Sequence, residues 1–136
     1  QVIGESSVEK NQVEIKEIFE QENVENILNK TNSLSKNGSE FAKNVEHELL
    51  GKSPTSLKIT FKQIHKATEM SLREALIMEY RMVQRCQASG DFYEGVRAML
   101  VDKDRKPDWK PSNLKKVDEI WVNHFFEPLH EKDLKI

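Results

Sequence analysis

The chain has 136 residues, a length that predicts one domain around one hydrophobic core. Charged residues make up 32% and hydrophobic residues 37%, as in a globular protein with a polar surface, and no apolar run is long enough to cross a membrane. The formal net charge of −2, with basic residues that acids interrupt, argues against a nucleic-acid-binding surface.

The charge is uneven along the chain. Residues 1–50 carry five Lys or Arg against ten Asp or Glu, residues 51–117 carry fourteen against eight, and residues 118–136 carry two against five. The basic excess in the middle fits a surface that faces an anion such as a phosphate. The alternative, which the counts alone favour, is a solvated helical surface of mixed charge.

Helical patterns fill the first fifty residues. Apolar side chains recur at helical spacing in residues 8–20, 24–34 and 39–50, with Asn23 placed to cap the second helix and Gly51 to follow the third. The expected buried stripes are Val8, Ile15, Ile18 and Phe19; Val24, Ile27, Leu28 and Leu34; and Phe41, Ala42, Val45 and Leu49.

Two later helix starts are marked more clearly. Ser53 can cap a helix whose first residue is Pro54, and Ser71 with Glu74 has the pattern of a capping box. The helix from 72 to about 88 has apolar residues on more than one face, which predicts a central and mostly buried helix. The helix after Pro54 has an expected buried face of Leu57, Phe61 and Ile64.

A further helix follows Gly90, with Asp91 and Glu94 as candidate caps. Its expected buried stripe is Phe92, Val96, Met99 and Leu100.

Beyond Lys103 the helical pattern fails, because Pro107 and Pro111 enforce extended or turn backbone around Trp109. A last short helix is expected to begin near Asp118 and to stop at Pro128. Its expected packing residues are Ile120, Trp121, Phe125 and Phe126. The pattern as a whole predicts an all-α fold of about six or seven helices.

The residues by themselves indicate no catalytic or metal site. The four histidines lack the spacing of a zinc-binding helix, and no Gly-rich phosphate loop or serine triad pattern occurs. Cys86 is the single cysteine, which excludes an internal disulfide, and its apolar helical context is typical of a small buried hydrophobe rather than a nucleophile. We therefore predict no metal and no catalytic residue in this chain.

Four motifs occur in a fixed order along the chain. They are NVENIL…GSEFA within 23–42, SPTSLKIT at 53–60, EALIMEYRMVQRC at 74–86 and DFYEGVRAMLVDKDRKPDWKP at 91–111. Together they resemble the C-terminal region of 3-hydroxyisobutyryl-CoA hydrolases, a branch of the crotonase superfamily, and the match is most specific from 53 to 111. The resemblance implies a single helical domain over residues 1–136, without the ββα spiral core of those enzymes.

Residues 1–20 match that family weakly, and their order is left open between a loose segment and a helix.

The resemblance also implies a function for the complete enzyme. It would hydrolyse the thioester of 3-hydroxyisobutyryl-CoA in mitochondrial valine breakdown, with CoA as part of the substrate and no separate cofactor. The oxyanion-hole backbone and catalytic carboxylates of the family lie in the spiral core, so this chain would carry none of them and would be inactive alone.

The partners and location follow from the same resemblance. The chain would pack on the spiral core in the mitochondrial matrix and would bind neither membrane nor nucleic acid. Apolar faces that the core would cover predict an exposed patch and self-association of the isolated chain.

A substrate-facing element is implied as well. The family's E-G-x-x-A helix and the lysine that follows it lie on the CoA-binding side, and they match Glu94, Gly95, Ala98 and Lys103 here. Lys103 would contact a CoA phosphate, with a solvated lysine as the alternative. Phe92 is a candidate for the same pocket, with core packing as the alternative.

Gly95 costs roughly 1 kcal/mol relative to alanine in an exposed helix interior, so it predicts either a close approach of neighbouring backbone or sharp packing.

Two other functions stay open at this point. The first is a non-enzymatic helical module that binds a partner helix through its apolar faces. The second is part of an enoyl-CoA hydratase or isomerase, because membership of a fold does not determine the reaction.

Overall fold

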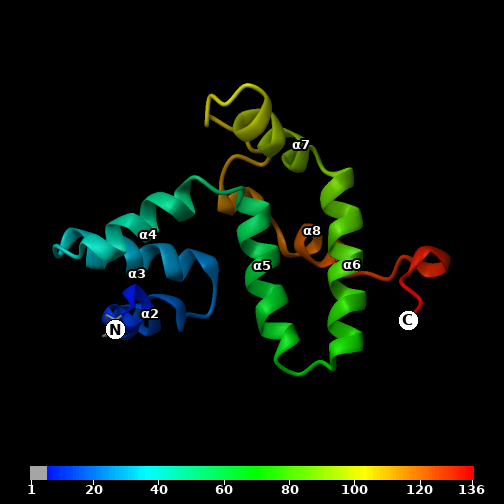
Figure 1. Cartoon of the computed structure of the whole chain (residues 1–136), viewed down its shortest axis with the longest axis horizontal. Coiled ribbons are helices and arrows are strands. Elements are labelled where there is room, and N and C mark those ends of the chain that lie inside the picture. Colours follow the sequence, from blue (N-terminus) through cyan, green and yellow to red (C-terminus); the bar gives the residue numbers. More distant parts are fainter. Residues whose placement is uncertain (1–5) are drawn as a thin grey trace, which may run out of the picture. The chain divides into compact units, whose positions relative to one another are not determined.

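The computed structural model describes residues 6–136, and every regular element among them is a helix. It contains eight α-helices, six of them seven residues or longer, which confirms the all-α prediction (Figure 1). Contacts divide the chain into two compact units, one reaching to Lys52 and one spanning Ser53–Ile136.

The first unit consists of four helices. They are α1 (Ser7–Lys10), α2 (Gln12–Phe19), α3 (Val24–Lys36) and α4 (Glu40–Leu50). α3 and α4 pack against each other and α2 packs on both. Asn23 caps α3 as predicted, since its Oδ1 accepts a hydrogen bond from the backbone N–H of Asn26 at 2.8 Å.

The core of the first unit is formed mainly by short apolar side chains: Ile18, Val24, Ile27 and Ala42. Thr31 is also fully buried, and its hydroxyl donates to the carbonyl oxygen of Ile27 at 2.6 Å. The hydroxyl is the only polar group of the Thr31 side chain, so this bond avoids the cost of burying it without a partner.

Two expectations about the first unit are wrong. The helix predicted over 8–20 is broken at Asn11 into α1 and α2, so Val8 leaves the expected stripe and is exposed, as is Phe19. Gly51 follows α4 but has φ of −80°, so it provides no left-handed C-cap; that conformation occurs at Gly38, with φ of 97°, between α3 and α4. Within the segment whose order was left open, residues 7–10 and 12–19 are helical, whereas residues 1–5 lie outside the described residues.

The second unit is built around α5 (Pro54–Ala67) and α6 (Leu72–Ala88). Both begin as predicted: Ser53 caps α5 with Pro54 in the first turn, and Ser71 and Glu74 form a capping box on α6. α7 (Gly90–Val96) continues into the π-helix η1 (Arg97–Val101). The 3-10 turn η2 (Leu114–Lys116), α8 (Glu119–His124) and the 3-10 turn η3 (His130–Lys132) complete the unit.

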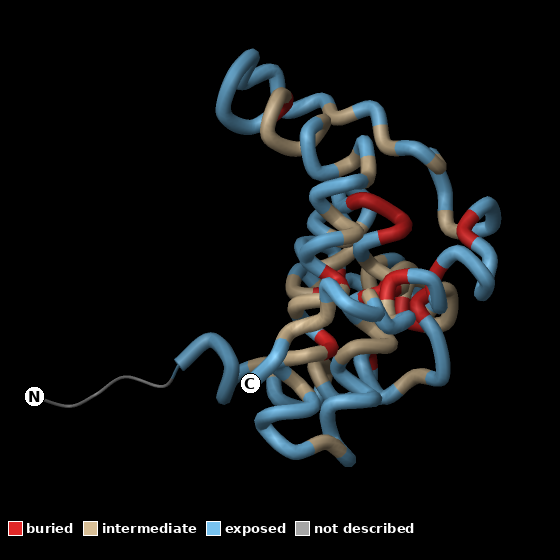
Figure 2. The backbone as a smooth tube through the Cα atoms, turned by 90° about the vertical axis from the view of Figure 1, so that its right-hand side faces the viewer, coloured by how far each residue is buried: buried red, intermediate tan, exposed pale blue. Residues whose placement is uncertain are grey.

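In the view of Figure 1, α8 appears between α5 and α6, and one cluster of buried side chains joins the C-terminal segment to both helices. The resulting core cluster is Ile59 from α5, Met78 and Met82 from α6, and Val117, Val122 and Phe125 from the C-terminal segment. Figure 2 shows that buried stretches are short and that most of the tube is exposed or half-buried.

Burial in the second unit differs from the expected pattern. α6 is not mostly buried: only Met78 and Met82 are, and Leu72 is 77% exposed. In α8 the predicted start at Asp118 is confirmed, but Ile120 is 82% exposed, whereas the neighbouring Val122 is buried. The reason is that α6 and α8 carry more apolar side chains than the described residues around them can cover.

The face of α5 also differs from the expected one, because Ile59 is buried where Ile64 is exposed. A last contact holds the C-terminal end on α6. The Nε of Arg81 donates to both carboxylate oxygens of Asp133 at 2.9 Å, and Arg81 Nη2 bonds the same group.

Candidate functional site

The two most specific motifs of the sequence meet at Ser53. Its hydroxyl accepts from the backbone N–H of Ser56 at 3.2 Å as the cap of α5, and it donates to Asp91 Oδ2 on α7 at 2.5 Å. Asp91 Oδ1 in turn accepts from the backbone N–H of Lys110 at 2.8 Å. The start of α5, the start of α7 and the exit loop are therefore tied together by one carboxylate.

This arrangement corrects the prediction that Asp91 and Glu94 cap α7. The N-cap of α7 is Ser89, and it makes no side-chain capping bond. Both carboxylates instead bind the loop that returns past α7, where backbone N–H groups would otherwise be unpaired.

Arg97 is the hub of the second half of the site. Its Nε and Nη2 donate to the two oxygens of Glu94 at 2.9 and 2.7 Å, and its Nη1 donates to Asp102 at 2.6 Å and Asp104 at 2.7 Å. Its Nη2 also reaches the carbonyl oxygen of Lys106 at 3.1 Å. One guanidinium thus joins α7 to the loop after η1.

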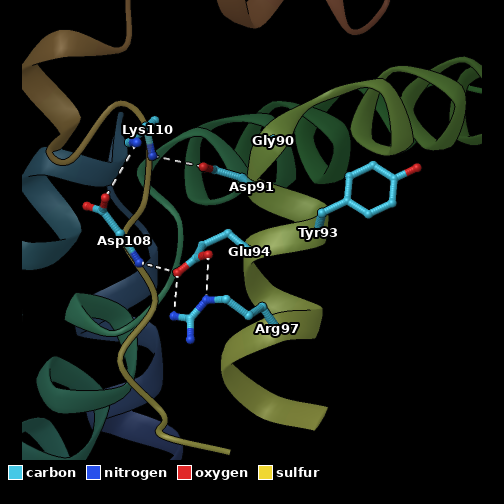
Figure 3. A pocket seen from close by; sticks show the side chains of 7 residues that line it. All are labelled: Gly90, Asp91, Tyr93, Glu94, Arg97, Asp108 and Lys110. Atoms are coloured by element: carbon cyan, nitrogen blue, oxygen red, sulfur yellow. Dashed lines mark hydrogen bonds and ion pairs between the residues drawn. The ribbon is translucent and has the colours of Figure 1, made fainter. Parts of the chain in front are cut away.

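Glu94 has a second partner in that loop. Its Oε1 accepts from the backbone N–H of Asp108 at 2.7 Å, as Figure 3 shows. The hydrogen bonds from Arg97 and then from the Asp108 N–H lower the pKa of Glu94 to about 2. The Arg97 guanidinium also lowers the pKa of Asp104, so both carboxylates are ionised at neutral pH.

The backbone changes direction sharply after η1. Lys103 and Arg105 both have φ of 56°, in the left-handed region that few residues other than glycine adopt. The backbone N–H of Arg105 returns to the carbonyl oxygen of Ala98 at 3.0 Å, which closes the loop onto the end of η1. Lys103 lies within this turn and is exposed.

Gly95 lies against the indole of Trp109. A Cβ at this position would be 3.3 Å from Trp109 Cη2 and 3.6 Å from Cζ3. The close neighbour of Gly95 is therefore a side chain from the segment between Pro107 and Pro111, rather than another backbone.

A pocket of about 420 Å³ lies between α7 and the exit loop. The residues that line it are Gly90, Asp91, Tyr93, Glu94, Arg97, Asp108 and Lys110 (Figure 3). The charged groups of this pocket already bind one another, and the Tyr93 ring points away from them in Figure 3. We therefore interpret this pocket as the place where α7 and the exit loop are bound together, rather than as a ligand site.

None of the three residues expected on the CoA side lines this pocket. Lys103 is exposed in the loop after η1, Gly95 packs against Trp109, and Phe92 is 46% exposed with an edge-on contact to the ring of Tyr93. Their contacts with substrate stay predictions. The ion pair between Glu94 and Arg97 could have been predicted from the sequence, because residues three apart lie on one face of a helix.

The expected buried stripe of this helix is wrong. Phe92, Met99 and Leu100 are exposed, Leu100 by 68%, and Val101 is equally exposed. The inner side of α7 and η1 is occupied instead by small residues, with Ala98 fully buried and Gly95 under the indole. Four large apolar side chains of this segment are consequently uncovered on this unit, and we call this set the η1 apolar face (Phe92, Met99, Leu100 and Val101).

Other kinds of site find no support in residues 6–136. No group of three or more His, Cys, Asp or Glu side chains in this part of the chain is placed to hold a metal. Burial raises the pKa of the half-buried Cys86 thiol, which favours the protonated form over a nucleophilic thiolate. A membrane crossing would need a longer and more apolar helix than any in this part of the chain.

Comparison with known proteins gives one clear family. The family model described as Enoyl-CoA hydratase/isomerase matches residues 1–126. The chain is 48% identical over 122 residues to the mitochondrial 3-hydroxyisobutyryl-CoA hydrolase of Danio rerio, and 42% identical over 128 residues to that of Homo sapiens. These alignments cover 90% and 94% of this chain but 31% and 32% of the relatives. The chain therefore spans about a third of the curated relatives it matches.

Two solved structures share the fold over nearly the whole chain. An enoyl-CoA hydratase from Rhodobacter sphaeroides 2.4.1 matches 100% of the chain and 40% of its own, with a TM-score of 0.88 and 28% identity. A carnitinyl-CoA dehydratase from Mycobacterium thermoresistibile matches 99% and 38%, with a TM-score of 0.87 and 26% identity.

Proposed function

The chain belongs to the enoyl-CoA hydratase/isomerase family, and from that premise we propose that it is the C-terminal helical part of an acyl-CoA thioester hydrolase acting on 3-hydroxyisobutyryl-CoA. The supporting observation is the identity of 42–48%, over about 90% of the chain, to proteins named as 3-hydroxyisobutyryl-CoA hydrolases. The hydratase and dehydratase structures share only 26–28% identity, so the hydrolase branch is favoured within the family.

In the proposed reaction, water adds to the thioester carbonyl and forms a tetrahedral oxyanion, which backbone N–H groups stabilise. The C–S bond then breaks, the sulfur leaves as the CoA thiol after taking up a proton, and 3-hydroxyisobutyrate is released. We place these donors and the catalytic carboxylates in the part of the relatives that this chain does not span. The chain is therefore inactive by itself and supplies no catalytic residue.

The proposed role of this chain is to pack on the catalytic core and to help close the acyl-CoA site. The η1 apolar face supports this role, since large apolar side chains left uncovered on one element are typical of an interaction surface. Lys103 contacts a CoA phosphate, with Phe92 and Gly95 on the same side of the substrate. The compartment is the mitochondrial matrix, a proposal supported by the word mitochondrial in the names of the relatives.

A thiol-release assay on 3-hydroxyisobutyryl-CoA tests the proposal. We expect release by the full-length protein that carries this chain and none by residues 1–136 alone. Release by neither would overturn the proposed reaction, and release by residues 1–136 alone would show that a catalytic site exists within them. Lys103→Ala in the full-length protein should raise KM about tenfold, the effect of losing one hydrogen bond to a charged group.

The second candidate is hydration or isomerisation of an enoyl-CoA, which the fold shared with a structure named as an enoyl-CoA hydratase supports. The same full-length protein assayed with an enoyl-CoA separates the two candidates. Loss of the enoyl absorbance without thiol release would favour the hydratase branch. Inactivity in both assays would favour the non-enzymatic interaction module.

A further inference from the structure

The Arg97 side chain makes a set of hydrogen bonds and ion pairs to which the proposed function assigns no role. Its guanidinium lies within 2.9 Å of three carboxylates, those of Glu94, Asp102 and Asp104, and also binds the carbonyl oxygen of Lys106. Glu94 belongs to α7, whereas the other partners belong to the loop after η1. Arg97 therefore helps to hold this loop against its own helix.

These bonds separate the charged residues of the loop into acids that are paired with Arg97 and cations that are not paired within the described part of the chain. In the sequence, residues 102–106 read DKDRK, and the acids alternate with cations. In the structure both acids are bound by Arg97, whereas Lys103 and Arg105 are exposed and form no ion pair among residues 6–136. Both carboxylates are exposed as well, but Arg97 neutralises them, so neither acid of the run is paired with Lys103 or Arg105.

The backbone supports the same interpretation. Lys103 and Arg105 both have φ of 56°, and residues with side chains adopt this region only where surrounding contacts hold them there. Two backbone groups help to hold the turn: the Arg105 N–H donates to the carbonyl oxygen of Ala98 at 3.0 Å, and the Lys106 N–H donates to Asp104 Oδ1 at 2.8 Å. The Arg97 guanidinium adds bonds on either side of Lys103 and Arg105, to Asp102, Asp104 and the Lys106 carbonyl. Without Arg97 these carboxylates would be free to pair with Lys103 or to repel an approaching anion.

We propose that Arg97 is a positioning residue, which holds Lys103 free and outward for the CoA phosphate and keeps Asp102 and Asp104 away from it. The inference rests on the proposed function in one respect, the contact between Lys103 and CoA. Arg97 itself does not touch the substrate, so its effect passes through Lys103. This dependence makes the proposal testable by a double-mutant cycle.

The experiment measures the Kd of the full-length protein for CoA by calorimetry, which needs no turnover. We expect Lys103→Ala and Arg97→Gln each to raise the Kd about tenfold. The Kd of the double variant should lie within about twofold of the higher of the two single-variant values. Arg97→Lys, which keeps a cation but not the fork, should fall between wild type and Arg97→Gln. Arg81→Gln removes a comparable guanidinium–carboxylate contact at the C-terminal end and should leave the Kd unchanged.

Each outcome decides the question. Unchanged CoA affinity in Arg97→Gln, or losses that multiply to about a hundredfold in the double variant, would overturn the role of Arg97. If Arg97→Gln fails to fold, Arg97→Lys with and without Lys103→Ala provides the same cycle. In turnover, both single variants should raise KM and leave kcat within about twofold, a split that general destabilisation would not produce.

The failure of the proposed function would look different. Wild-type protein that binds CoA but releases no thiol from 3-hydroxyisobutyryl-CoA would refute the reaction, and the CoA cycle would still decide the role of Arg97. Unchanged CoA affinity in Lys103→Ala would refute the Lys103 contact and, with it, this inference.

Discussion

Arg97 and Asp102 are joined twice. The backbone N–H of Asp102 donates to the carbonyl oxygen of Arg97 at 2.8 Å, and the Arg97 Nη1 donates to Asp102 Oδ2 at 2.6 Å. The backbone bond is the i→i+5 bond of a π turn, a geometry that often marks functional sites. The end of the helix is thus fixed where the chain leaves for the loop that carries Lys103.

The fit of Gly95 under Trp109 should make this position intolerant of larger side chains. Gly95→Val would push methyl groups into an indole whose segment lies between two prolines, and we expect the unfolding free energy to fall by about 1–3 kcal/mol. Gly90→Val is the matched control, because nothing lies within 4 Å of a Cβ there. Urea unfolding of both variants measures the difference, and equal stabilities would contradict the packing.

Ser53 should matter more than an ordinary helix cap. Ser53→Ala removes the cap of α5 and the bond to Asp91, whereas Ser71→Ala removes a cap whose carboxylate partner is exposed and only three residues away. Cap losses typically cost about 0.5–2 kcal/mol, and we expect Ser53→Ala to cost roughly 1 kcal/mol more than Ser71→Ala. An Asp91→Asn background should shrink this excess, and an excess that persists there would rule out the link.

The pH dependence of the Glu94 contact follows from its pKa. This pKa falls from its ordinary 4.5 to about 2, so the ionised form is favoured in the folded chain and its contribution to stability is complete above about pH 5. The contribution is lost as the pH falls from 4.5 toward 2. The difference in unfolding free energy between wild type and Glu94→Gln should therefore vanish near pH 2. An NMR titration of the Glu94 carboxyl with a midpoint near 4.5 would contradict this.

The η1 apolar face should govern association of the isolated chain. We expect residues 1–136 to self-associate in analytical ultracentrifugation, and Leu100→Gln to reduce this while changing the unfolding free energy by no more than about 0.5 kcal/mol. Ile59→Ala, a variant of the buried core, should instead cost about 2–5 kcal/mol. A wild-type chain that stays monomeric and binds no hydrophobic dye would argue against an uncovered surface.

Helix starts could be predicted from the sequence because the interactions that form them are local. Asn23, Ser53, Ser71 and Asp118 each accept a hydrogen bond from a backbone N–H three residues ahead, so the side chain and its partner lie in the same short window. The family could be recognised for a similar reason, since its motifs are continuous in the sequence.

Burial and the joint at Asp91 depend on distant residues and were missed. Periodicity identifies the apolar faces of a helix but not how many of them find a neighbour, which is why Leu72, Leu100 and Ile120 are exposed. The partners of Asp91 lie 38 residues before it and 19 residues after it, beyond the reach of any local pattern.

The link through Asp91 limits how this element can be reused in protein engineering. A graft of residues 90–111 alone onto another scaffold would leave the carboxylate of Asp91 without the hydroxyl of Ser53. α6 packs on α7 and would be missing as well. The smallest transferable module is therefore the whole second unit, Ser53–Ile136, because the segment after Pro111 supplies Val117, Val122 and Phe125 to its core.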